Sequence, residues 1–199
     1  MGYVTTFIRS QLLVTLPYPT SDFTGQVIIV TGSNTGLGFE AARHFLRLNA
    51  AKVILAVRSV AKGETAAKDL LATTKRAPGC VEVMQVDLSS YKSIEAFASR
   101  VRGMDRLDAF VQNAGILTYK WVLEEGDEST ITVNVTGATL LCLSVLPKLR
   151  ESASKHGTRG RFTFVGSDLQ YIAKFKESQT NGTLFDALNN KESADMDDR

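Results

Sequence analysis

The fold is decided by the stretch Val27-Ile28-Ile29-Val30-Thr31-Gly32-Ser33-Asn34-Thr35-Gly36-Leu37-Gly38. It begins with a continuous β-branched run, which is typical of a strand buried on both faces of a parallel sheet. The glycines then open a helix whose inward face is predicted to carry Leu37, Ala41, Phe45 and Leu48. A glycine turn between such a strand and a helix N-terminus lets backbone N–H groups approach a pyrophosphate. The stretch therefore predicts a phosphate-binding turn, with a purely structural turn as the alternative.

The alternation of strand and helix continues along the chain. Further strands are predicted at 52–57, 81–86, 107–112 and 161–165, with helices at 60–72, from Ser90 onward, and at about 127–149. Ser90 is predicted to cap its helix, whose inward face would carry Ile94, Phe97, Ala98 and Val101. The long helix is expected to bury Ile131, Val135, Ala138, Cys142 and Val145. Right-handed crossovers between such strands cover both faces of a sheet. The predicted fold class is α/β, a Rossmann-like doubly wound parallel sheet with about five strands.

Two terminal segments fall outside this pattern. Residues 1–24 form an arm whose apolar patch ends at Pro17-Tyr18-Pro19, and we expect it to pack on the domain surface as a strap. Residues 25–199 then make one domain, in which 168–199 is an irregular tail with scattered apolar side chains. No sixth strand is predicted there.

Composition excludes several function classes. The 199 residues are 44% hydrophobic and 22% charged, which is the balance of one soluble globular domain. A net charge of +2 without a basic run excludes a nucleic-acid footprint. Cys80 and Cys142 are read as reduced thiols in a cytoplasmic protein and not as a metal site or a disulfide. No apolar run is expected to span a membrane, because Gly137 and Pro147 bound the better candidate.

The glycine spacing, TGxxxGxG, resembles that of the short-chain dehydrogenases/reductases, and in particular the retinol-dehydrogenase-like reductases and their fungal relatives. The resemblance runs from Gly25 to Ser167 and implies a cofactor-binding site at the carboxyl ends of the strands. The residues nominated for it are Gly32, Ser33, Asn34, Gly36, Leu37, Gly38, Arg58, Lys62, Asp87, Leu88, Asn113, Ala114 and Gly115.

The resemblance also implies roles for individual residues. Asp87 would contact the adenine, the Asn113-Ala114-Gly115 segment would shape the cofactor cleft, and Asn134 and Ser167 would be catalytic. Each has a structural alternative. Asp87 could cap a loop, Asn113 could close a strand, Asn134 could be a helix-side polar residue, and Ser167 could be a turn residue.

The charge pattern after the second strand favours NADP over NAD. A site for NAD places a carboxylate on the ribose hydroxyls about 20 residues beyond the glycines, whereas NADP needs cations for its 2′-phosphate. No Asp or Glu occurs between Glu40 and Glu64, while Arg58 and Lys62 both lie there. The alternative for Lys62 is a solvated lysine in the first turn of a helix.

One part of the family pattern is missing from the 199 residues. Members of this family protonate the substrate oxygen with a Tyr four residues ahead of a Lys, and no Tyr-x-x-x-Lys occurs here. Tyr171 and Lys174 are three residues apart, which orients the two side chains differently on a helix. The resemblance implies that 168–199 is the insert that precedes this Tyr, so we expect a shortened reductase.

Three interpretations follow. The first is an NADP-dependent oxidoreductase acting on a carbonyl or alcohol of a small molecule, with secondary-metabolite substrates implied by the fungal resemblance alone. The second is a catalytically inactive NADP-binding module, or an interaction partner of another reductase. The third is an incomplete gene product without a stable fold. A homo-oligomer would form through the long helix near 127–149.

Overall fold

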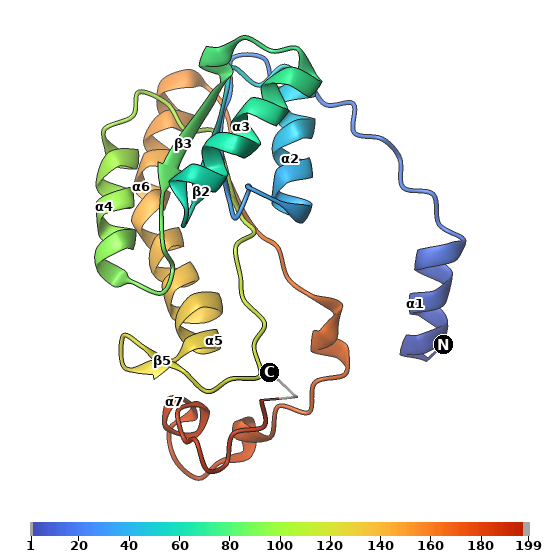
Figure 1. The fold of residues 1–199 in the computed structure, drawn as a ribbon, viewed down its shortest axis with the longest axis vertical. Coiled ribbons are helices and arrows are strands. Elements are labelled where there is room, and N and C mark those ends of the chain that lie inside the picture. The colour runs from blue at the N-terminus through green and yellow to red at the C-terminus, as the bar shows by residue number, and fades with distance from the viewer. Residues whose placement is uncertain (1, 197–199) are drawn as a thin grey trace.

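The computed structural model describes residues 2–196, so positions 197–199 of the predicted tail lie outside the described residues. Its centre is a parallel sheet with the strand order β3 (Val81–Gln85), β2 (Lys52–Val57), β1 (Val27–Thr31), β4 (Ala109–Gln112) and β7 (Arg161–Phe164) (Figure 1). In this register, Val27 lies opposite Lys52 on one side of β1 and Ile28 lies opposite Ala109 on the other. The Rossmann-like fold class is thus confirmed.

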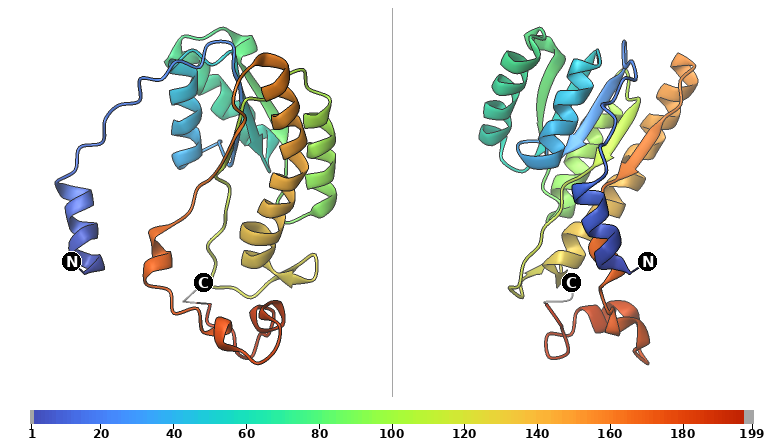
Figure 2. Two further views of the ribbon diagram at one scale, coloured as in Figure 1. Left: turned by 180° about the vertical axis from the view of Figure 1, so that it is seen from behind. Right: turned by 90° about the vertical axis from the view of Figure 1, so that its right-hand side faces the viewer.

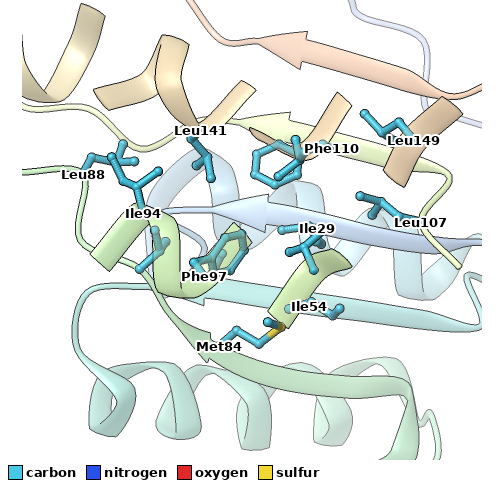
Figure 3. Close-up of a cluster of buried hydrophobic side chains, with 14 of the residues drawn as sticks. Ile29, Ile54, Met84, Leu88, Ile94, Phe97, Leu107, Phe110, Leu141 and Leu149 are labelled. Atoms are coloured by element: carbon cyan, nitrogen blue, oxygen red, sulfur yellow. The ribbon is translucent and has the colours of Figure 1, made fainter. Parts of the chain in front are cut away.

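Helices cover both faces of the sheet (Figures 1 and 2). Helices α2 (Gly36–Arg47) and α3 (Val60–Thr74) cover one face, and α4 (Tyr91–Arg102) and α6 (Ala138–His156) cover the other. Alternate residues of β1 enter the two cores, since side chains along a strand point to opposite faces. Ile28 packs on the α2/α3 side. Ile29 packs on the α4/α6 side with Phe97, Phe110 and Leu141 (Figure 3).

The predicted inward face of α2 is right near its end, where Leu48 is buried and Phe45 packs against the core, and wrong at its start. Leu37 is 76% exposed, whereas Gly38, Ala42 and Leu46 are buried. The helix rests on its glycine, because a Cβ on Gly38 would lie 2.7 Å from the carbonyl oxygen of Gly32. The prediction was based on the spacing of apolar side chains, so it could not identify a close backbone contact that only a glycine allows.

The predicted long helix begins later than expected and is irregular. Residues 123–128 form a small hairpin of β5 (Leu123–Glu124) and β6 (Asp127–Glu128). They are followed by α5 (Ser129–Ile131), a π-helical segment η2 (Thr132–Gly137) and α6. A π turn takes up an extra residue and shifts the phase of the apolar stripe. Val135, predicted to be buried, is therefore exposed, while Val133 is buried.

The helical stretch Ser129–His156 runs through Gly137 and Pro147, which were expected to keep the apolar run shorter than a membrane span. It has 28 residues and is long and apolar enough to cross a membrane by length and composition. Half of its most apolar window is buried inside the protein. The core helices of soluble proteins pass the same test, and this helix packs against α4 and the sheet.

The two terminal segments contain short helices. The arm begins with α1 (Tyr3–Leu12), which the sequence did not predict, and continues as an extended segment (Figure 2). A single turn, η1 (Pro78–Cys80), precedes β3. After β7 the described part of the tail contains η3 (Asp168–Tyr171), η4 (Lys176–Gln179) and α7 (Leu184–Leu188). Asn189 fastens this tail to the hairpin, because its side-chain oxygen accepts a 2.7 Å hydrogen bond from the backbone nitrogen of Glu128.

Candidate cofactor-binding site

A buried polar network joins the carboxyl ends of β1 and β4. The Thr31 hydroxyl donates to Oε1 of Gln112 (3.0 Å) and accepts from the backbone nitrogens of Asn113 and Ala114, each at 2.9 Å. The Asn113 amide nitrogen donates to the Thr31 carbonyl at 3.0 Å. Sequence reasoning did not name Thr31 or Gln112 as site residues. The available signal was a pair of polar residues, each closing a buried apolar strand.

The glycine turn uses two different properties of glycine. Gly36 begins α2 with φ +61°, a left-handed conformation that side chains disfavour, and the space beside it is open. A Cβ on Gly38 would lie 2.5 Å from the Asn113 amide nitrogen. Thr35 at the N-cap of α2 makes no side-chain hydrogen bond to the helix. The turn therefore presents the N-terminal N–H groups of α2 without a capping side chain, as an anion site requires.

A cavity of about 220 Å³ lies beside this turn at the carboxyl ends of β1, β2, β3 and β4. This is the crevice where the chain crosses from one half of the sheet to the other, and open α/β sheets bind their ligands there. Its lining residues are Gly32, Asn34, Ala56, Arg58, Ser59, Lys62, Val86, Asp87, Leu88, Ala114, Gly115, Ile116 and Val133. The sequence had not named Ala56, Ser59, Val86, Ile116 or Val133.

Two cations and one carboxylate line the cavity. Arg58 follows the last residue of β2 and is exposed, and Lys62 lies in the first turn of α3. Ser59 caps that helix by accepting a hydrogen bond from the Lys62 backbone. Asp87 follows β3, and its Oδ1 accepts two hydrogen bonds from Ser89, at 2.9 and 3.0 Å. Asp87 therefore caps its loop, as the structural alternative proposed, and it also lines the cavity.

Asn134 links the π-helical segment η2 to the loop after β4. Its Oδ1 accepts from the Ile116 nitrogen at 2.9 Å, and its Nδ2 donates to the Ile116 oxygen at 2.8 Å. A Cβ on Gly115 would approach Oδ1 of Asn134 to 3.0 Å. The Asn134 amide therefore holds the loop at the end of the cavity, close against η2.

Other predicted site residues lie apart from the cavity lining. The Ser33 hydroxyl is buried and donates to the Val30 oxygen at 2.7 Å. Leu37 points into solvent at the start of α2. Ser167 is exposed and caps η3 by accepting a 3.2 Å bond from the Leu169 nitrogen. Tyr171 is also exposed, and its ring lies 6.4 Å from that of Tyr3.

The sheet order, the glycine turn and the crevice beside it define a Rossmann nucleotide-binding fold. A family model described as short chain dehydrogenase matches residues 26–174. The chain belongs to the short-chain dehydrogenase/reductase family of oxidoreductases, as its motifs predicted.

Curated relatives come from fungi. The chain is 44% identical over 191 residues to the short chain dehydrogenase/reductase dmxR8 of Cryptosporiopsis sp., a match covering 95% of this chain and 59% of that protein. It is 45% identical over 200 residues to the short chain dehydrogenase atnD of Emericella nidulans, covering 100% and 63%. The short-chain dehydrogenase anuD of Penicillium roqueforti is 44% identical over 193 residues, covering 97% and 50%. The chain thus spans about half to two thirds of these relatives.

Solved structures give the same family. A short-chain dehydrogenase from Sphingobium yanoikuyae, in complex with NADPH, is 26% identical with a TM-score of 0.63, covering 82% of this chain and 60% of that one. The oxidoreductase yciK from E. coli is 25% identical with a TM-score of 0.63, covering 87% and 69%.

Proposed function

We propose that this chain forms the cofactor-binding part of an NADP-dependent short-chain oxidoreductase that interconverts a carbonyl and an alcohol on a small molecule. The observation that carries the proposal is the charge of the cavity beside the glycine turn. Arg58 and Lys62 both line it, and β2 ends without the carboxylate that NAD recognition uses. The NADPH complex of the Sphingobium relative supports the same cofactor.

The residues present fit such a cofactor. Gly38 keeps the turn compact where a Cβ would clash, so the N-terminus of α2 can approach a pyrophosphate. Arg58 and Lys62 would bind the 2′-phosphate, Asp87 would accept a hydrogen bond from the adenine amine, and Ala114 and Gly115 would form the wall of the cleft. The Thr31 network holds that wall against β1.

NADP(H), when bound, supplies or accepts a hydride. Of this chain's residues, Ser167 would hydrogen-bond the substrate oxygen once a substrate site forms around it, and Asn134 would support the proton relay from η2. An alkoxide produced by carbonyl reduction must also be protonated. The family's Tyr-x-x-x-Lys pair is absent from these 199 residues, so the acid that performs this step in the family is not among them.

Cofactor choice is tested by titrating the chain with NADPH and with NADH. NADPH is expected to bind more tightly, and Arg58→Asp should weaken NADPH about 10- to 100-fold and so shrink its advantage over NADH, because it removes a charge-assisted contact. Arg150→Asp makes the same charge change on α6, away from the cavity, and should change neither affinity. Equal wild-type affinity for the two nucleotides would refute the phosphate-pocket assignment.

Activity is tested by NADPH oxidation with a panel of aldehydes and ketones. The 199-residue chain should be slower than a version extended through a Tyr-x-x-x-Lys segment and the strands after it, by the roughly 10²- to 10⁴-fold that a positioned general acid contributes. Equal turnover by the two chains would show that the missing pair is not required.

The proposal also includes a cytoplasmic location for the enzyme. Cys80 and Cys142 are free thiols, which supports a reducing, cytoplasmic compartment.

Leu140 and Leu143 are exposed on the outer side of α6, which supports a homo-oligomer through this helix. Sedimentation of the wild type and of Leu143→Glu tests the oligomer, and identical monomeric profiles would exclude it.

A further inference from the structure

Helix α1 turns its polar side toward the rest of the chain. Tyr3, Thr6 and Ser10 line a groove with Asp168 and Tyr171. The Tyr3 hydroxyl donates to Oδ2 of Asp168 at 3.1 Å. Phe7 lies at the border of this groove, stacked on Tyr3 with ring centroids 6.1 Å apart. The contacts that hold α1 in place therefore use its hydroxyl-bearing face.

The opposite side of α1 is an apolar stripe that no other part of the described chain covers. Val4, Ile8 and Leu12 recur every four residues, so they lie on one side of the helix. All three are at least half exposed, and Leu13 and Leu16 beyond the helix are exposed too. Helices on soluble domains normally turn such a stripe toward the core. Here the orientation is reversed.

The extended segment after α1 holds the helix away from the sheet (Figures 1 and 2). This segment is fixed to the end of α2, where the Arg47 guanidinium lies 4.1 Å from the Tyr18 ring centroid and donates to the Pro19 oxygen at 2.8 Å. The Tyr18 ring also contacts the His44 ring edge-on, at 5.0 Å. The anchored segment lets α1 project beyond the domain with its apolar stripe free.

We propose that α1 is an interfacial helix that binds a lipid surface reversibly. The charge of the arm favours this partner: its first 21 residues contain Arg9 and no Asp or Glu, whereas the whole chain carries 21 acids. An acid-free amphipathic helix is suited to anionic headgroups, and its apolar side chains enter the acyl boundary without a shaped pocket. A single helix of this size gives weak, reversible attachment, in contrast to a membrane-spanning segment.

The test is flotation of the purified 199-residue chain with phosphatidylcholine vesicles containing phosphatidylserine. Wild type should float with the vesicles, and Ile8→Glu should lower its partition coefficient about tenfold or more, because a charge replaces an isoleucine that would enter the acyl boundary. Thr6→Glu introduces the same charge on the face that contacts the chain, and it should lower partition by less than about threefold. No residue of α1 is buried, so both variants should keep the wild-type thermal melt.

Three results would overturn the proposal. The first is a wild-type chain that does not bind the anionic vesicles. The second is an equal loss of binding in Ile8→Glu and Thr6→Glu, because the stripe would then have no special role. The third is an oligomer in the absence of lipid that Ile8→Glu dissociates, which would make the stripe a protein interface. Each result is independent of cofactor binding and activity.

Discussion

Replacing Gly38 with alanine tests how the glycine turn is held. The added Cβ would lie 2.5 Å from the Asn113 amide nitrogen and 2.7 Å from the backbone oxygen of Gly32. A rotamer change cannot relieve the second contact, so α2 must move, at a cost of about 1–3 kcal/mol. Displacing the Asn113 amide from the Thr31 oxygen adds about 0.5–1.5 kcal/mol. The higher helix propensity of alanine offsets about 1 kcal/mol of this cost, so Gly38→Ala is expected to lower the free energy of unfolding by about 0.5–3.5 kcal/mol.

Urea unfolding followed by circular dichroism measures this loss, and two other glycines serve as controls. Gly79→Ala has open space and an ordinary φ, so it should stay within about 0.5 kcal/mol of wild type. Gly36→Ala also has open space but places alanine at φ +61°, which costs about 1–2 kcal/mol without touching Asn113. A Gly38→Ala protein as stable as Gly79→Ala would refute the close-packing argument.

Three further changes probe the frame around the site. Thr31→Val should cost about 2–4 kcal/mol in urea unfolding, because two backbone N–H groups after β4 lose their acceptor, whereas Thr31→Ser should retain most of the stability. Asp108→Asn should cost about 2–4 kcal/mol in a thermal melt, because Arg106, at 2.7 Å, loses its buried partner; an unchanged melt would contradict this. Hydrogen bonds from Thr24 and Asn49 lower the pKa of Asp22 below its usual 3.8. The folded-state pKa is thus depressed, so the stabilisation by Asp22 is present above about pH 4 and lost as the pH falls through the folded-state value. The stability difference between wild type and Asp22→Asn should therefore narrow below pH 4, and a constant difference would argue against it.

The sheet was predictable because its signals are local. Four β-branched residues before the glycines specify β1, and Ser90 caps α4 as predicted, accepting from the Ser93 nitrogen at 3.3 Å. The inward face of α4, including Phe97, was also right because every turn of that helix is regular. On the long helix the prediction was right at Ile131, Ala138 and Val145 and wrong at Val135 inside η2, since a π turn is specified by its contacts with other segments and leaves no period in the sequence.

Site residues were predictable where their position along the backbone brings them to the cavity. They were not predictable where their role depends on the direction in which the side chain points. Arg58 and Asp87 follow strand ends, and the ends of neighbouring parallel strands meet at one edge, so both line the cavity. Ser33 lies in the glycine turn after β1, yet its hydroxyl points away from the cavity and donates to the Val30 oxygen. The roles of Thr31 and Gln112 depend on a partner about 80 residues away. Such pairings are not visible in a single sequence.

The π-helical segment η2 also limits which changes in chain length this protein tolerates. Within this segment, the Asn134 side chain makes two hydrogen bonds to the Ile116 backbone. At its end, Gly137 packs so closely against Leu88 that a Cβ would lie 2.4 Å from the Leu88 oxygen. Deleting one residue between these two contacts would return the turn to α geometry and rotate one contact relative to the other by about 100°. Loops elsewhere can gain or lose residues at low cost. In homologous genes, single-codon insertions and deletions should therefore collect in the surface loops and be purged from codons 132–137.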